Sequence, residues 1–80
     1  MIRPTTDDTA VVLSDVWQEF LEVDSVKPGD RILELGGNSL IATMIANRIE
    51  LAWGFRPSME NLLTQTFDEL SALCGRRRAE

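Results

Sequence analysis

The sequence has 80 residues, 44% hydrophobic and 26% charged, a balance typical of one small folded domain and not of a disordered chain. Its net charge of −5, from 13 acidic and 8 basic residues, disfavours nucleic-acid binding, because an acidic surface repels phosphates, and favours basic partners. A single cysteine, Cys74, and no histidine exclude an intramolecular disulfide and zinc sites built on several Cys or His ligands.

The N-terminal segment MIRPTTDD lacks the apolar stretch of a signal peptide. No run of the sequence approaches the ~18 apolar residues that a membrane span requires. We therefore expect one domain over residues 1–80, with a core over about 8–75 and flexible termini. We expect it in a reducing cytoplasm, without attachment to a membrane.

The first predicted element is an amphipathic helix over about residues 8–23, with Asp7 or Asp8 as its N-cap. Its apolar side chains recur at the i, i+3, i+4 and i+7 positions of one face: Leu13, Val16, Trp17 and Phe20. The polar residues between them lie on the other faces. This spacing predicts that the helix packs one side against a core.

A loop follows over residues 24–38, because Pro28 and three glycines prevent one continuous helix. The loop nevertheless contains four apolar residues that we expect to pack against the rest of the protein: Val26, Ile32, Leu33 and Leu35. A long loop with its own apolar anchors is usually functional or tightly packed.

The second helix is predicted from Ser39 to about Trp53, ended by Gly54 and then by Pro57. At 100° per residue one stripe should face the core: Ile41, Ile45, Ile49 and Ala52. Three more apolar residues lie to one side of that stripe: Leu40, Met44 and Leu51. The resulting apolar arc is wider than one core contact needs, so a neighbouring element or a partner should cover it.

Two helices complete the chain. Ser58 should cap a short helix that ends near Leu63, and Thr66 with Glu69 forms a capping box for the last helix. That helix carries Phe67, Leu70, Leu73 and Cys74 as core residues and ends in three arginines, residues 76–78, expected in solvent. The sequence thus predicts an all-α fold, a small four-helix bundle of three longer helices and one short helix, with a long loop between the first two. Such a fold leaves no deep pocket, which argues against an intrinsic enzyme.

Ser39 is the residue whose role the pattern leaves most open. A nucleophile elbow would need a glycine at Ile41, a catalytic triad would need a histidine, and a phosphate-binding loop would need a lysine beside the serine. Two interpretations remain: Ser39 is a helix N-cap, or its hydroxyl is modified by an anionic group that the helix N-terminus favours by ~0.3–1 kcal/mol. Gly36 and Gly37 either let a modifying enzyme approach closely or form a turn that needs positive φ.

The segment DRILELGGNSLIATMIANRIE resembles the core of the peptidyl carrier proteins, the thiolation domains of nonribosomal peptide synthetases in the acyl carrier superfamily. Eight positions match the family pattern in register: Asp30, Leu35, Gly36, Gly37, Ser39, Leu40, Ala42 and Thr43. The resemblance extends over about residues 10–73, because the helix spacing and the late TFDEL segment also fit.

The resemblance implies that Ser39 accepts a 4′-phosphopantetheine arm from coenzyme A through a phosphopantetheinyl transferase, with Gly36, Gly37, Asn38 and Leu40 around the attachment point. The arm's thiol would hold an amino acid or peptide as a thioester during natural-product biosynthesis. The implied partners are adenylation enzymes and condensation, tailoring or thioesterase enzymes, which act on a non-catalytic, metal-free monomer.

A docking face for these partners is implied at three residues that flank the arm: Leu40, Met44 and Ile41. Ile41 also fits the core stripe. Leu40 and Met44 could equally be docking residues or core residues. Some positions depart from the family: Ile32 and Leu33 replace an often aromatic pair, Asn38 stands where histidine or aspartate is usual, and Met44 where a basic residue is common. Residues 56–58 also differ from the usual start of the third helix.

Two alternatives stay open. An acyl carrier for fatty acid or polyketide chains would share Ser39 and the fold, but it usually has a more acidic second helix and D-S-L at the serine, whereas this helix has only Glu50, opposed by Arg48. An unmodified helical interaction module would lose only ~1 kcal/mol of stability in Ser39→Ala. A complete chain would be a free-standing carrier, and an excised one would come from a multidomain synthetase.

Overall fold

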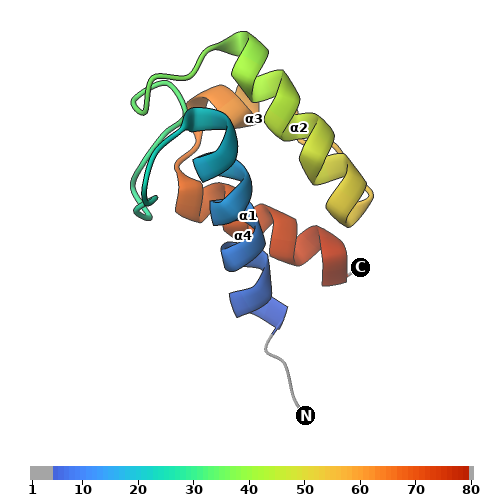
Figure 1. The fold of residues 1–80 in the computed structure, drawn as a ribbon. Coiled ribbons are helices and arrows are strands. Elements are labelled where there is room, and N and C mark those ends of the chain that lie inside the picture. Colours follow the sequence, from blue (N-terminus) through green and yellow to red (C-terminus); the bar gives the residue numbers. More distant parts are fainter. Residues whose placement is uncertain (1–4, 80) are drawn as a thin grey trace.

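The computed structural model describes residues 5–79 of the chain, and the side chains of residues 9–76. It contains the helices α1 (Thr5–Leu21), α2 (Ser39–Trp53), α3 (Met59–Thr64) and α4 (Phe67–Ala79) (Figure 1). No strand occurs in the described part, so the predicted all-α fold of three longer helices and one short helix is confirmed. Of the predicted flexible termini, residues 5–7 and 76–79 belong to α1 and α4, and residues 1–4 and 80 lie outside the described residues.

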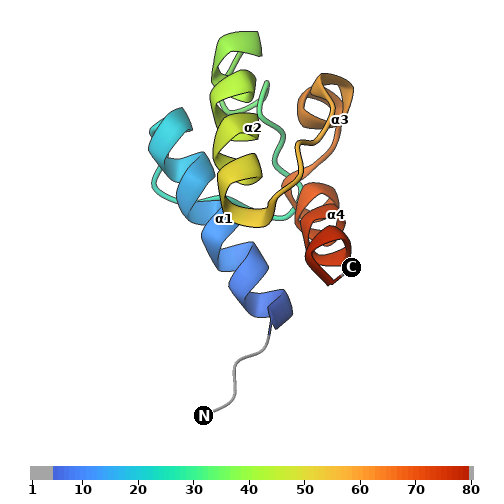
Figure 2. The ribbon, with the colours of Figure 1, turned by 90° about the vertical axis from the view of Figure 1, so that its right-hand side faces the viewer.

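The helices form one bundle in which α1 packs against both α2 and α4, and α2 packs against α3. Figure 2 shows α1 and α2 side by side, with α3 and α4 across from them. The long loop leaves the upper end of α1, descends to the start of α4 and then rises to the start of α2. No described helix is long and apolar enough to cross a membrane.

The core is filled by the predicted face of α1 and by matching faces of the other helices. Leu13 and Trp17 are fully buried, Val16 is nearly so, and Phe20 packs at the edge of the core. The Trp17 ring meets Phe67 of α4 edge to face, with 5.2 Å between centroids. The remaining buried members come from the loop and the other helices: Ile32, Ala42, Ile45, Ala46, Ile49, Leu62, Leu70 and Cys74.

The ends of α1 differ from the prediction. The helix already begins at Thr5, so Asp7 and Asp8 lie inside it and do not cap it. It ends at Leu21, and Glu22 follows in the left-handed region with φ 57°. The apolar repeat fixes the core face but not the first turn, because threonine and aspartate both suit several positions near a helix N-terminus.

Helix α2 has the predicted bounds, and Gly54 ends it in the left-handed conformation with φ 82°. The predicted core stripe was partly wrong, because the buried residues are Ala42, Ile45, Ala46 and Ile49. Ala52 is exposed and Ile41 is only partly buried. The actual set follows the i, i+3, i+4, i+7 rule of a helix face, and its two alanines occupy little space between α2 and its neighbours.

The loop between α1 and α2 is held by backbone hydrogen bonds to the start of α4. Phe67 N–H donates to the Asp30 carbonyl at 2.7 Å, and Asp68 N–H donates to the Pro28 carbonyl at 2.9 Å. These carbonyls satisfy N–H groups that have no acceptor within the helix itself. The Arg31 Nε also donates to the Thr64 carbonyl at the end of α3, at 3.1 Å.

Three of the four apolar loop residues pack as expected: Ile32 is fully buried, and Val26 and Leu35 are partly buried against the core. Leu33 does not, since 53% of it is exposed. The pair lies within the turn over residues 32–36, in which the Ile32 side chain is directed inward and the Leu33 side chain is left in solvent. The loop therefore presents an apolar side chain to solvent a few residues before Ser39.

Helices α3 and α4 begin as predicted. The Ser58 Oγ accepts from Asn61 N–H at 3.0 Å and caps α3, which ends at Thr64 rather than Leu63. In the capping box of α4, Glu69 Oε1 accepts from Thr66 N–H at 2.9 Å and Thr66 Oγ1 accepts from Glu69 N–H at 3.2 Å. Arg76 is exposed as expected, whereas the side chains of the next two arginines lie outside the described ones.

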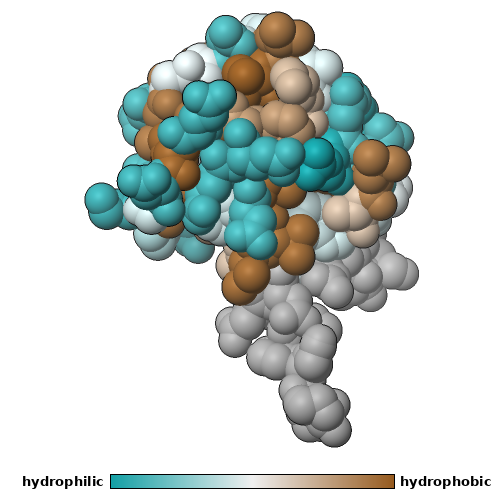
Figure 3. Space-filling view, viewed as in Figure 1, coloured by the Kyte–Doolittle hydropathy of each residue, from teal (hydrophilic) through white to brown (hydrophobic). Residues whose placement is uncertain are grey.

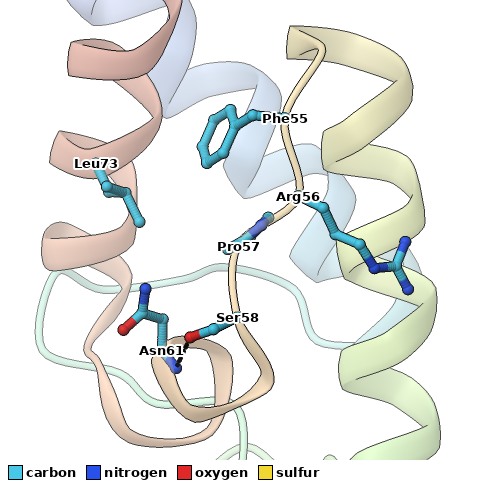
Figure 4. A pocket seen from close by; sticks show the side chains of 6 residues that line it. All are labelled: Phe55, Arg56, Pro57, Ser58, Asn61 and Leu73. Carbon is cyan, nitrogen blue, oxygen red and sulfur yellow. Dashed lines mark hydrogen bonds between the residues drawn. The ribbon is translucent and has the colours of Figure 1, made fainter.

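A pocket of about 250 Å³ lies between the α2–α3 connection and α4 (Figure 4). Its walls are formed by side chains from the connection, α3 and α4: Phe55, Arg56, Pro57, Ser58, Asn61 and Leu73. In Figure 4 the Arg56 guanidinium points away from the pocket toward α2. The pocket lies beyond the C-terminal end of α2, whereas Ser39 lies at the N-terminal end of that helix. The pocket and Ser39 are therefore separate sites.

Candidate functional site

The segment before Ser39 folds into a compact turn. Gly37 N–H donates to the Ile32 carbonyl at 2.9 Å, and Gly36 N–H donates to the Leu33 carbonyl at 3.3 Å. Gly36 has φ +92°, a conformation that residues with a Cβ rarely adopt. Of the two interpretations of Gly36, the structure therefore shows a turn that needs positive φ.

Gly37 is required for a different reason, close packing. A Cβ at this position would lie 2.5 Å from the Ile32 Cγ2 and 2.8 Å from the Leu21 Cδ2. Carbon atoms in contact are normally ~3.5–4.0 Å apart, so a side chain does not fit here. The glycine lets the turn close over buried Ile32 and so fixes the direction from which the chain enters α2.

Asn38, and not Ser39, caps α2. Asn38 has extended backbone angles, φ −149° and ψ −171°, and its Oδ1 accepts from Ile41 N–H at 2.9 Å. Its carbonyl accepts the first bond of the helix, from Ala42 N–H at 2.9 Å. Of the two interpretations of Ser39, the N-cap is therefore wrong, because asparagine is as good a cap as serine and is the residue that lies one position outside the helix.

Ser39 is consequently the first residue of α2, and it is exposed. Its hydroxyl makes no hydrogen bond to any described residue; only its carbonyl is used, as the acceptor for Thr43 Oγ1 at 2.9 Å. The N–H groups of Ser39 and Leu40 likewise donate to no described acceptor. An accessible hydroxyl thus stands beside free N–H groups at the positive end of a helix, where an anion is favoured.

Exposed apolar side chains border this serine. Leu40 is 68% exposed and Met44, one turn further along α2, is 37% exposed. Ile41 packs against the core as a partly buried residue. Figure 3 shows apolar side chains at the upper end of the molecule, where α2 begins. Of the three predicted docking residues, the structure therefore exposes two and places Ile41 largely in the core.

The arginines of α2 and its surroundings are paired. Arg48 lies 3.2 Å from Glu19 and stacks over Phe20, with its guanidinium carbon 5.0 Å from the ring centre. Arg56 pairs with Glu50 at 3.1 Å. All of these ionic groups are substantially exposed, so each pair is worth at most ~1 kcal/mol. Since Arg48 and Arg56 each pair with a glutamate, these two arginines add no unpaired positive charge to the helix that begins at Ser39.

Among the described residues, no ionisable side chain bonds to the Ser39 hydroxyl. The described residues contain no group of Cys, Asp or Glu side chains that could hold a metal ion. Cys74 is buried, and its desolvation raises the pKa of the thiol to about 11, which keeps it protonated and unreactive near neutral pH. The arrangement suits a hydroxyl that receives an anionic group through another protein, since no described base lies within hydrogen-bonding distance of it.

The sequence matches the phosphopantetheine attachment site family over residues 11–75. The chain belongs to this family. Members of the family carry 4′-phosphopantetheine covalently and serve as carriers rather than catalysts. The resemblance predicted from the GGNSL segment is thus confirmed, and the exposed hydroxyl of Ser39 fits the attachment of such a group.

The chain is similar to short stretches of large peptide synthetases. It is 35% identical over 78 residues to phosphinothricin tripeptide synthetase PhsC of Streptomyces viridochromogenes, covering 96% of this chain and 7% of that protein. It is 39% identical over 61 residues to nonribosomal peptide synthetase 5 of Aspergillus fumigatus, covering 71% of this chain and 3% of that protein. The chain therefore spans only a small part of the length of these relatives.

The fold is shared with a solved structure. The solution structure of an active-site mutant of a peptidyl carrier protein superimposes with a TM-score of 0.82 at 21% identity, covering 89% of this chain and 80% of that one. At this identity the likeness concerns the fold. It confirms the helical bundle predicted from the sequence.

Two features of the site were missed in the sequence: the capping role of Asn38 and the close packing of Gly37. An asparagine directly before a helix is itself a cap signal, so the first could have been found. The second could not, because the contact joins Gly37 to Leu21 at the end of the preceding helix and depends on the folded loop.

Proposed function

We propose that Ser39 is the attachment point of 4′-phosphopantetheine and that the domain carries an amino acid or peptide on it during nonribosomal peptide biosynthesis. The observation that supports this most strongly is the exposed, unbonded hydroxyl of Ser39 at the start of α2, within a family whose members carry this group. Gly36, Gly37, Asn38 and Leu40 surround it.

In the transfer that we propose, the Ser39 oxygen forms a bond to the phosphorus of the phosphopantetheinyl group of coenzyme A. The phosphoanhydride bond breaks, adenosine 3′,5′-bisphosphate leaves, and the hydroxyl proton passes to a base of the transferase. The domain contributes an accessible hydroxyl and the N-terminal end of α2, whose partial positive charge stabilises the new phosphodiester by ~0.3–1 kcal/mol.

When bound, the arm supplies the thiol to which the amino acid or peptide is joined as a thioester. The domain itself is non-catalytic and needs no metal. Its partners are a phosphopantetheinyl transferase, an adenylation enzyme, and condensation, tailoring or thioesterase enzymes, which dock on Leu40, Met44 and the exposed edge of Ile41. We place it in the cytoplasm as a monomeric domain over residues 1–80.

The cargo is tested with the phosphopantetheinylated protein. It is incubated with ATP, amino acids and a panel of adenylation enzymes, and in parallel with malonyl-coenzyme A and an acyltransferase. A mass gain equal to an aminoacyl group, reversed by hydroxylamine as a thioester is, supports the peptidyl carrier. Loading from malonyl-coenzyme A alone would instead favour a polyketide or fatty-acid carrier.

A further inference from the structure

Ser39 stands next to a second residue that can cap the same helix, and only one of them can do so. The N-cap is the residue with extended backbone angles whose side chain accepts from an N–H two or three residues ahead. Asparagine and serine are about equally good at this, so the sequence Asn38–Ser39 allows two alternative helix starts, one residue apart. In the structure the start lies at Asn38.

The two starts have opposite consequences for the hydroxyl. With Asn38 as the cap, Oδ1 of Asn38 accepts from Ile41 N–H at 2.9 Å and the Ser39 hydroxyl makes no bond to a described residue. With Ser39 as the cap, the same hydroxyl would accept from Ala42 N–H, and the Ser39 backbone would become extended. A hydroxyl oxygen turned into the helix end is poorly placed to attack phosphorus.

We propose that Asn38 is a positioning residue for the modification of Ser39: by capping α2 itself, it keeps the serine hydroxyl free for phosphoryl transfer. This inference rests on the proposed function. In this role Asn38 touches neither coenzyme A nor the reacting atoms. It acts by determining which residue begins α2, and so whether the Ser39 hydroxyl is free. The turn before it supports the arrangement, since Gly37 is packed against Leu21 and Ile32 and brings Asn38 in at the extended angles of a cap.

The test compares Asn38→Ala, which removes the cap, with Asn38→Thr, which restores a neutral cap of another shape. Ser58→Ala serves as the matched control, because Ser58 caps α3 through a bond of 3.0 Å to Asn61 N–H and is no part of the site. Phosphopantetheinyl transfer is followed by mass spectrometry at a series of carrier concentrations. Backbone chemical shifts of Ser39 and amide exchange of Ile41 are measured on the unmodified proteins.

Asn38→Ala is expected to raise the KM for the carrier about twofold with little change in kcat, because only the fraction of molecules with a free hydroxyl binds productively. The change stays below the roughly fivefold factor that corresponds to the ~1 kcal/mol of a cap, because the Asn38 start is the favoured one in the wild type. The Ser39 shifts should move from helical toward extended values, and Ile41 should exchange faster. Asn38→Thr should recover most of the KM, and Ser58→Ala should leave it unchanged.

An unchanged KM in Asn38→Ala, helical Ser39 shifts in that variant, or an equal effect of Ser58→Ala would each overturn the inference while leaving the proposed function intact. A wild-type chain that accepts no phosphopantetheine would overturn the proposed function and this inference together. The two failures are therefore distinguishable in one set of reactions.

Discussion

Gly37 packs against Ile32 and Leu21, and this contact holds both the loop and the entry to α2. Gly37→Ala tests how much the contact contributes to stability. The added Cβ would lie 2.5 Å from Ile32 Cγ2, 2.8 Å from Leu21 Cδ2 and 2.9 Å from the Ile32 carbonyl oxygen. The two carbon atoms belong to side chains that can shift. The carbonyl cannot move easily, because it is backbone and already accepts from Gly37 N–H.

Relieving these contacts requires displacements of up to ~1 Å in a packed region, and overpacking of this kind costs ~1–3 kcal/mol. For a domain of this size, each kcal/mol lowers Tm by ~4–8 °C. Gly37→Ala should therefore lower the free energy of unfolding in urea by ~1–3 kcal/mol and Tm by at least ~4 °C.

Gly29→Ala is the matched control, because a Cβ there meets nothing within 4 Å and Gly29 has no positive φ. We expect it to leave stability unchanged or to raise it by up to ~1 kcal/mol through a less flexible unfolded chain. A Gly37→Ala protein within ~0.5 kcal/mol of wild type, the range of substitutions that disturb no packing, would refute the packing argument. An equally large loss in Gly29→Ala would also refute it.

Three further predictions concern the site and the core. Asn38→Ala should cost ~0.5–1 kcal/mol in urea unfolding, less than a full cap where Ser39 takes over, whereas Ser39→Ala should cost less than ~0.5 kcal/mol; the reverse order would show that the serine is the cap. Leu40→Ala should change the free energy of unfolding by less than ~0.5 kcal/mol, because the side chain is 68% exposed, yet reduce transfer from an adenylation enzyme; unchanged transfer would remove Leu40 from the docking face. Burial raises the pKa of the Cys74 thiol from 9.0 to about 11, so the folded state keeps a proton that the unfolded chain releases, and stability should decline as pH rises from 9 toward 11. Urea unfolding across this range, with Cys74→Ala as the control, checks the slope, and equal slopes in the two proteins would contradict it.

Much of the fold follows from local chemistry that the sequence displays. The face of α1 was predictable because Leu13, Val16 and Trp17 recur at helical spacing, and the end of α2 because Gly54 is suited to the left-handed cap. The capping box of Thr66 and Glu69 was equally readable, since both of its hydrogen bonds join residues three apart.

The parts that sequence reasoning missed depend on choices between near-equal alternatives or on distant contacts. Asn38 and Ser39 are similar caps, and the turn that Gly37 closes brings Asn38 in at the extended angles of a cap. Ala52 and Leu33 have apolar side chains but are exposed, because no other helix packs over them. Exposure of apolar residues is common in small domains, where too little core exists to bury them all.

The most direct test of the account is the intact mass of the protein after incubation with coenzyme A and a broad-specificity phosphopantetheinyl transferase, beside a Ser39→Ala variant. The account predicts a gain of one phosphopantetheinyl group in the wild type, located on the peptide that contains Ser39, and no gain in the variant. Equal gain in the folded Ser39→Ala protein, or no gain in a folded wild type when the transferase modifies another carrier, would contradict it.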